Sequence, residues 1–209
     1  MNDEEMFDAT SRQRHRLADT LGGFDDDQWD HDSLCDGWRA RDVLGHLVAI
    51  LDTPIWRLLL GIARARGFDR YMAGRAVEFG ARPPAELLAR YRELADRRFS
   101  PPGVGAFGPL ADVCVHTRDI ERPLGIGATL DPEVVRFVLD RLVSKPRGFV
   151  PTDRFEGLAL EATDLDWRAG EGAAVAGPGE ALLLAMLGRR PALADLTGDG
   201  VAQLDRHLG

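Results

Sequence analysis

Asp112 and His116 are the residues of this 209-residue chain whose types and spacing best suit chemistry. They are the first and last residues of the string Asp-Val-Cys-Val-His, which lies in a segment whose apolar pattern predicts a helix. Positions i and i+4 of a helix share one face, so the carboxylate and the imidazole would point in the same direction. The pair offers two adjacent ligands for a metal ion.

His46 is the third candidate ligand. It lies beside an apolar stripe, with Val43 and Leu47 among its members, that predicts another helix. In an antiparallel bundle the two helices could bring His46 to Asp112 and His116. Two imidazoles and one carboxylate suit a divalent ion, zinc by preference, and leave one position open for water or substrate. From spacing alone, a surface Asp-His pair and an unrelated core histidine remain the more common arrangement.

Neither cysteine is interpreted as a nucleophile. Cys114 lies two positions from both Asp112 and His116, so it faces away from them and is expected to be a buried structural thiol. Cys35 precedes the helix of His46 and could approach the site, but no base is evident near it, so packing is the preferred interpretation. Both thiols are expected to be reduced.

Composition excludes several other function classes. The formal net charge of −8 disfavours a general nucleic-acid binder. The sequence contains neither a GxxxxGK[ST] phosphate loop nor a GxSxG nucleophile elbow. The acidic start, Met-Asn-Asp-Glu-Glu, does not resemble a secretory signal, and no apolar run approaches the roughly 18 residues of a membrane span. We therefore expect a cytoplasmic protein that binds neither nucleic acid nor a membrane. His15, His31 and His207 are expected in solvated or frayed segments.

Apolar periodicity divides the chain into a helical part and a mixed part. After Pro54 the helical pattern resumes, so the helix of His46 either kinks or restarts there, whereas residues 24–37 are expected to form a loop. We predict an α+β protein, with a four-helix bundle over residues 1–128 and a small α+β domain over residues 129–209. The expected helices cover about residues 4–21, 39–50 and beyond, a segment that opens at residues 83–84 and ends before residue 101, then 110–122, 133–143, 180–187 and 200–208. The expected strands cover 155–163, 164–167 and 173–176.

Three segments, in order along nearly the whole chain, resemble one protein family. Ser33–Leu47, SLCDGWRARDVLGHL, resembles the C-x-G-W-x-x-x-D-x-x-x-H-L motif of the DinB-like, mycothiol-dependent maleylpyruvate isomerase family. Asp112–Gly125, DVCVHTRDIERPLG, is similar to that family's acidic-x3-His-x-x-Asp motif. The family's C-terminal domain is resembled by Thr163-Asp164, Trp167, the helix over 182–187, Gly188-Arg189 and Gly198-Asp199-Gly200.

The resemblance implies a DinB-like four-helix bundle that holds a divalent metal, usually zinc, through His46, Asp112 and His116. It also implies mycothiol, a thiol of actinobacteria, as cosubstrate, which agrees with Lys145 being the only lysine among 26 basic residues, a skew typical of GC-rich genomes. A metal-bound thiolate would attack a small electrophilic substrate. Arg189 matches a family arginine that could bind a substrate carboxylate, although it could equally cap the preceding helix.

The particular reaction stays open. The characterised isomerase type carries Glu where this chain has Asp112, so both an isomerase and an S-transferase are retained. The first alternative is a non-catalytic, metal-binding or ligand-binding DinB-like stress-response protein. A weaker alternative is an interaction module that acts through its acidic surface and binds no metal. Oligomeric state and the electrophile are not predicted.

Overall fold

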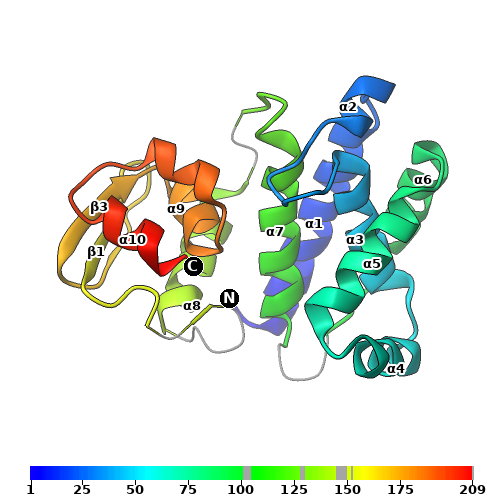
Figure 1. Ribbon diagram of the computed structural model, residues 1–209, viewed down its shortest axis with the longest axis horizontal. Helices are drawn as coiled ribbons and strands as arrows, with labels where there is room; N and C mark the ends of the chain where they lie inside the picture. The colour runs from blue at the N-terminus through cyan, green and yellow to red at the C-terminus, as the bar shows by residue number, and fades with distance from the viewer. Residues whose placement is uncertain (101–104, 128–129, 145–149, 152, 209) are drawn as a thin grey trace. The chain divides into compact units, whose positions relative to one another are not determined.

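Residues 1–100, 105–127, 130–144, 150–151 and 153–208 are described by the structure, a computed structural model. The chain divides into two units, Asn2–Gly127 and Ala128–Gly209. The boundary expected between residues 128 and 129 lies outside the described residues. Helices make up the first unit, whereas the second unit combines helices with a three-stranded sheet (Figure 1), which confirms the predicted α+β class.

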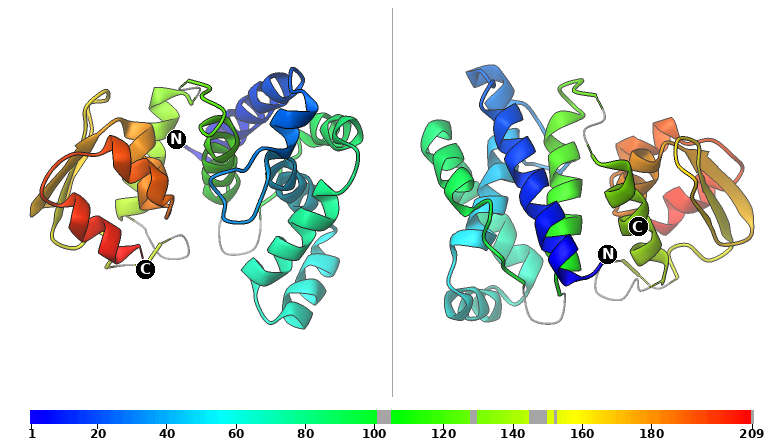
Figure 2. Two further views of the ribbon diagram at one scale, coloured as in Figure 1. Left: turned by 45° about the horizontal axis from the view of Figure 1, so that its top comes forward. Right: turned by 180° about the vertical axis from the view of Figure 1, so that it is seen from behind.

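A closed bundle of helices forms the first unit. α1 packs against α6 and α7, and α3 packs against the same two helices, so each of the four has two neighbours around a common core. Both views in Figure 2 show α1 and α7 side by side. The predicted four-helix bundle is therefore confirmed. Its helices are α1 (Asp3–Leu21), α3 (Ala40–Asp52), α6 (Pro84–Leu94) and α7 (Phe107–Glu121).

Local sequence signals set the helix ends. The Asn2 side chain accepts a hydrogen bond from the Glu5 backbone N–H at 3.0 Å, and the Glu5 carboxylate accepts one from the Asn2 N–H at 2.8 Å, which caps the start of α1. α4 (Ile55–Ala65) begins directly after Pro54. Proline lacks an N–H and has a fixed φ, so it suits a helix start. The helix of His46 therefore ends and a new one restarts.

Two α-helices of the first unit were not predicted from the sequence, nor was a short 3-10 helix over residues 190–195 in the second unit. α2 (Asp26–Asp30) lies in the segment expected to be a loop, and the Asp25 side chain caps it by accepting from the Gln28 N–H at 2.9 Å. Five residues are too few for an apolar period to appear. α5 (Phe68–Gly80) packs along α3 through Met72, Ala76 and Phe79, which are buried.

Glycines let α3 and α5 approach closely. A Cβ atom on Gly45 would lie 2.6 Å from the backbone nitrogen of Gly80, and one on Gly80 would lie 2.9 Å from the Cα of Asp42. Both separations are shorter than Cβ atoms tolerate, so the two helices meet backbone to backbone. This contact fixes α3, and with it the neighbouring His46.

The second unit packs helices on a small mixed sheet. Its strands lie in the order β2-β1-β3, with β1 antiparallel to β2 and parallel to β3. The strand predicted over residues 164–167 is wrong: β2 starts at Arg168, and Asp164 instead accepts a hydrogen bond from the Gly179 N–H at 2.7 Å. The elements are α8 (Pro132–Ser144), β1 (Leu158–Ala162), β2 (Arg168–Ala169), β3 (Ala173–Gly177), α9 (Gly179–Met186), the 3-10 helix η1 (Arg190–Asp195) and α10 (Val201–His207).

Within the described ranges, none of the helices combines the length and the apolar character required to cross a bilayer.

An ion pair between α3 and α6 should make stability depend on pH. Arg90 Nε donates to Asp52 Oδ1 at 3.2 Å, and this hydrogen bond keeps the pKa of Asp52 below its usual value. Because both side chains are partly exposed, Asp52→Asn should lower the free energy of unfolding at pH 7 by only about 0.5–1 kcal/mol. The carboxylate contributes fully above its unfolded-state pKa of about 3.9, and its contribution is lost as pH falls through the folded-state pKa.

Urea unfolding at several pH values tests this. The difference between parent and Asp52→Asn should be constant near neutral pH and shrink toward zero below about pH 3. A difference that stays unchanged in acid would mean that the ion pair does not stabilise the bundle.

Candidate metal centre

The three residues predicted as ligands converge inside the bundle. His46 Nε2 on α3 lies 3.4 Å from Asp112 Oδ1 on α7, and His116 Nε2 lies 3.5 Å from the same oxygen. The centroids of the two imidazole rings are 4.6 Å apart. The contact between α3 and α7 therefore places two nitrogens around one carboxylate oxygen.

The spacing of these atoms fits a tetrahedral cation. Two ligands that each lie about 2.0–2.1 Å from a zinc ion are roughly 3.3–3.4 Å apart at the tetrahedral angle. The N···O separations of 3.4 and 3.5 Å are close to this edge and longer than the roughly 2.9 Å of a good hydrogen bond. Two imidazole nitrogens and a carboxylate oxygen also suit zinc chemically. The residues therefore fit the divalent metal implied by the family resemblance.

Opposite charges shift the pKa values of Asp112 and His116. Burial raises the pKa of Asp112, but His46 and His116 together outweigh it and lower that pKa to about 2. Burial lowers the pKa of His116, but hydrogen bonding with Asp119 and Cys35, together with the charge of Asp112, raises it to about 10. His116 thus lies between two carboxylates, those of Asp112 and Asp119, which favour a positive charge at this position, and a bound cation would supply that charge.

The segment between α2 and α3 covers the two histidines. The ring centroid of Trp38 lies 5.5 Å from that of His46 and 6.4 Å from that of His116. The Leu34 N–H donates to the backbone carbonyl of Asp119 on α7 at 3.0 Å, which holds the segment against that helix. Trp38 thus shields both imidazoles on one side. By contrast, 33% of the Asp112 side chain is exposed, so Asp112 is only partly buried and is the most exposed member of the triad.

Cys35 requires a correction, whereas Cys114 does not. Cys35 packs against the hydrophobic core as predicted, but the expectation that no base lies near it is wrong. Its Sγ donates to Asp119 Oδ2 at 3.0 Å and lies 3.8 Å from His116 Nδ1. Asp119 Oδ2 also lies 2.8 Å from His116 Nδ1, a contact that was not predicted although the spacing of three residues places both on one helix face. Cys114 is fully buried, as predicted.

Arg189 belongs to the second unit, where it follows α9. Its Nη1 donates to the backbone carbonyl of Leu187 at 2.9 Å. This contact is the helix-capping arrangement given as the alternative to substrate binding, and the role of Arg189 toward a substrate carboxylate stays a prediction.

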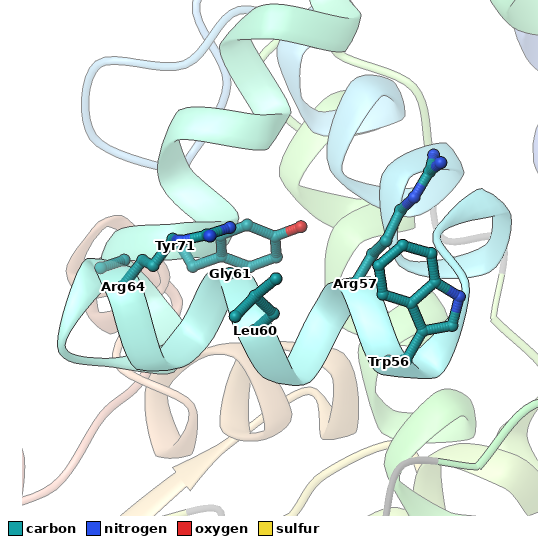
Figure 3. A pocket seen from close by; sticks show the side chains of 7 residues that line it. Trp56, Arg57, Leu60, Gly61, Arg64 and Tyr71 are labelled. Atoms are coloured by element: carbon teal, nitrogen blue, oxygen red, sulfur yellow. The ribbon is translucent and has the colours of Figure 1, made fainter.

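A surface pocket of the first unit lies between α4 and α5 and is lined by none of the three triad residues (Figure 3). The ring of Tyr71 lies against Gly61 in it, where a Cβ atom would overlap the ring. The pocket contains no candidate metal ligand, so we do not assign the chemistry to it. Its lining residues are Trp56, Arg57, Leu60, Gly61, Arg64, Ala65 and Tyr71.

Fold and site together define a class: a four-helix bundle with a histidine-rich candidate metal centre, joined to a small α+β unit. Residues 10–100 match the family model described as the mycothiol maleylpyruvate isomerase N-terminal domain. This match over residues 10–100 agrees with the resemblance inferred from the sequence. The matched range contains Cys35, Trp38 and His46 and ends before α7, which carries Asp112 and His116.

Solved structures share the fold over almost the whole chain. A crystal structure of the mycothiol-dependent maleylpyruvate isomerase has a TM-score of 0.62 at 16% sequence identity. The alignment covers 95% of this chain and 93% of the isomerase chain. A crystal structure of a single-residue variant of that isomerase has a TM-score of 0.65, with the same identity and coverage. At this identity the likeness shows the fold. No curated protein matches the sequence.

Proposed function

We propose that this protein is a metal-dependent enzyme that uses mycothiol as a cosubstrate and acts on a small electrophilic molecule. The observation that carries the proposal is the triangle of His46, Asp112 and His116, whose separations suit a cation better than hydrogen bonds. The N-terminal domain family and the shared fold support mycothiol as the thiol.

His46, Asp112 and His116 would hold the divalent ion, zinc by preference. When bound, such an ion lowers the pKa of a coordinated thiol, so that the thiolate is available at neutral pH. Three protein ligands leave a position for that thiol. Trp38 covers the imidazoles on one side, whereas Asp112 is partly exposed, so we expect small molecules to approach the triad from the side of Asp112.

An isomerase is the preferred form of this activity, because the structural neighbours are crystal structures of an isomerase. In an isomerisation the sulfur adds to an electrophilic carbon, the former double bond rotates, and the sulfur leaves again, so the thiol is regenerated. In a transferase the new carbon–sulfur bond is kept and one thiol is consumed for each product. Arg189 is proposed to bind a carboxylate of the substrate.

Thiol balance during turnover tests the proposal and separates its two forms. Zinc-loaded protein is mixed with mycothiol and maleylpyruvate, and both compounds are followed by chromatography. Loss of maleylpyruvate with unchanged thiol indicates the isomerase, and loss of both in equal amounts indicates the transferase. His116→Ala at the same concentration is the control and should be inactive.

A negative result also discriminates. If the protein binds zinc but shows no thiol-dependent loss of maleylpyruvate or of a panel of other electrophiles, the enzyme proposal fails. The non-catalytic metal-binding protein then becomes the better account of the same triad.

A further inference from the structure

We propose that Asp119 is a positioning residue for His116, and that Cys35 completes a three-residue relay by holding Asp119 in place. Within the proposed function, on which this inference rests, the relay sets the affinity of the metal centre. The three side chains come from two elements: Cys35 lies in the segment between α2 and α3, and Asp119 and His116 lie on α7.

Both ring nitrogens of His116 face a carboxylate. Its Nε2 faces Asp112 Oδ1 at 3.5 Å, and its Nδ1 faces Asp119 Oδ2 at 2.8 Å. A neutral imidazole that donates its one N–H from Nδ1 presents the lone pair of Nε2 to the opposite side. The hydrogen bond to Asp119 therefore selects the tautomer and the ring orientation needed for binding a cation beside Asp112.

Asp119 itself accepts hydrogen bonds from side chains of two different elements. It is fully buried, and a buried carboxylate is costly unless hydrogen bonds compensate it. Its Oδ2 accepts from His116 Nδ1 and from Cys35 Sγ, the latter at 3.0 Å. Donors that converge on one oxygen from different elements leave the carboxylate a single orientation, which is what a positioning residue requires.

The same three residues could be regarded as a second metal site, since their ligand atoms lie within 4.8 Å of one another. The distances favour the relay. The 2.8 Å between Asp119 Oδ2 and His116 Nδ1 is hydrogen-bond length and shorter than the roughly 3.3 Å edge of a zinc tetrahedron. An ion there would also compete for the ring nitrogen that orients His116.

Cys35 connects the relay to the segment between α2 and α3, which carries Trp38. Two bonds join its segment to Asp119: the thiol donates to the carboxylate, and the Leu34 N–H donates to the backbone carbonyl at 3.0 Å. The same segment carries Trp38 against both imidazoles. Cys35 therefore acts on the metal centre through Asp119 as a hydrogen-bond donor, a role that serine can fill and alanine cannot.

Zinc affinity of the full-length variants, measured by competition with a chromophoric chelator, tests the relay. Asp119→Asn keeps an acceptor oxygen and loses the charge, so it should weaken zinc binding about 10-fold, and Asp119→Ala should approach about 100-fold. Glu121→Gln is the matched control. Glu121 is another fully buried carboxylate on α7, and it accepts a hydrogen bond from Arg118 Nη1 at 2.8 Å. This variant should lower the melting temperature and leave zinc affinity unchanged.

Two further readouts separate positioning from general structural damage. The visible absorption of the cobalt(II)-loaded protein should shift in Asp119→Asn and not in Glu121→Gln, because it reports the geometry of the ligands. Cys35→Ser should retain the affinity of the parent, and Cys35→Ala should lose part of it. If Asp119→Ala does not fold, the zinc affinities of these two cysteine variants still test the relay.

The outcomes also separate this inference from the proposed function. A parent protein that binds no zinc overturns the metal centre and, with it, this role of Asp119. A parent that binds zinc while Asp119→Asn matches it in affinity and cobalt spectrum overturns the relay alone. Equal losses of zinc affinity in Asp119→Asn and Glu121→Gln would show that only the stability of α7 matters, which also overturns the relay.

Discussion

His116→Ala should weaken zinc binding by about three orders of magnitude, because zinc-binding free energies of about 10–16 kcal/mol are shared among few ligands. His46→Ala should behave alike, since the two Nε2 atoms lie at almost equal distances, 3.4 and 3.5 Å, from Asp112 Oδ1. Isothermal titration of metal-free protein with zinc, at fixed pH, measures the change. The exposed His15 provides the control, because His15→Ala should leave the affinity unchanged.

Asp112 is the most informative member of the triad. Aspartate is one methylene shorter than the glutamate of the isomerase type, so direct ligation requires the two helices to lie close together. The position of its Oδ1 near both imidazoles meets this requirement, and Asp112→Ala should lose affinity by orders of magnitude, as the histidine variants do. A loss of only about 10- to 100-fold would instead mean that a water bridges the carboxylate to the ion.

If both Asp112→Ala and Asp112→Asn bind zinc like the parent, Asp112 is not a ligand. If His116→Ala also binds zinc like the parent, the triad is not the metal centre at all.

Gly45→Ala should destabilise the bundle by about 3 kcal/mol, at the upper end of the cost of overpacking a core. The added methyl group would meet the backbone of Gly80 at 2.6 Å, and backbone atoms cannot turn aside as a side chain can. α3 would have to separate from α5 and would carry His46 with it. We therefore expect zinc affinity to fall together with the urea midpoint.

Gly74→Ala is the matched control for this prediction. Gly74 is an exposed helical position of α5, and a Cβ atom there meets nothing within 4 Å. Since alanine favours a helix over glycine, this variant should be more stable than the parent by about 0.5–1 kcal/mol. Equal urea midpoints for the Gly45 and Gly74 variants would contradict the close packing of α3 on α5.

The convergence of His46, Asp112 and His116 follows from regularities that a sequence displays. Helical spacing fixes the relation of Asp112 to His116, and the apolar stripe beside His46 indicates a core-facing helix. Their meeting requires only that the two helices be neighbours in a bundle. The family motifs favoured this arrangement over an unrelated surface pair.

Other features depend on contacts that no local pattern encodes. The path of the segment around Cys35 is set by its hydrogen bonds to α7, so its contact with Asp119 was not foreseen. α5 was missed because Gly67, Gly74 and Gly80 weaken its helical pattern, although the spacing of Met72, Ala76 and Phe79 was available as a signal. The two residues of β2 form a strand only because β1 pairs with them.

His46 and Asp112 are 66 residues apart along the chain, and this separation determines when the metal centre forms during folding. Contacts between distant residues form only after the entropy of closing a long loop has been lost, so the triad is complete only when α7 has docked on α3. Zinc bound to such a site stabilises the folded state but stabilises the folding transition state only slightly. The ion should therefore lower the unfolding rate and lengthen the lifetime of the folded bundle. The refolding rate should remain that of the metal-free chain.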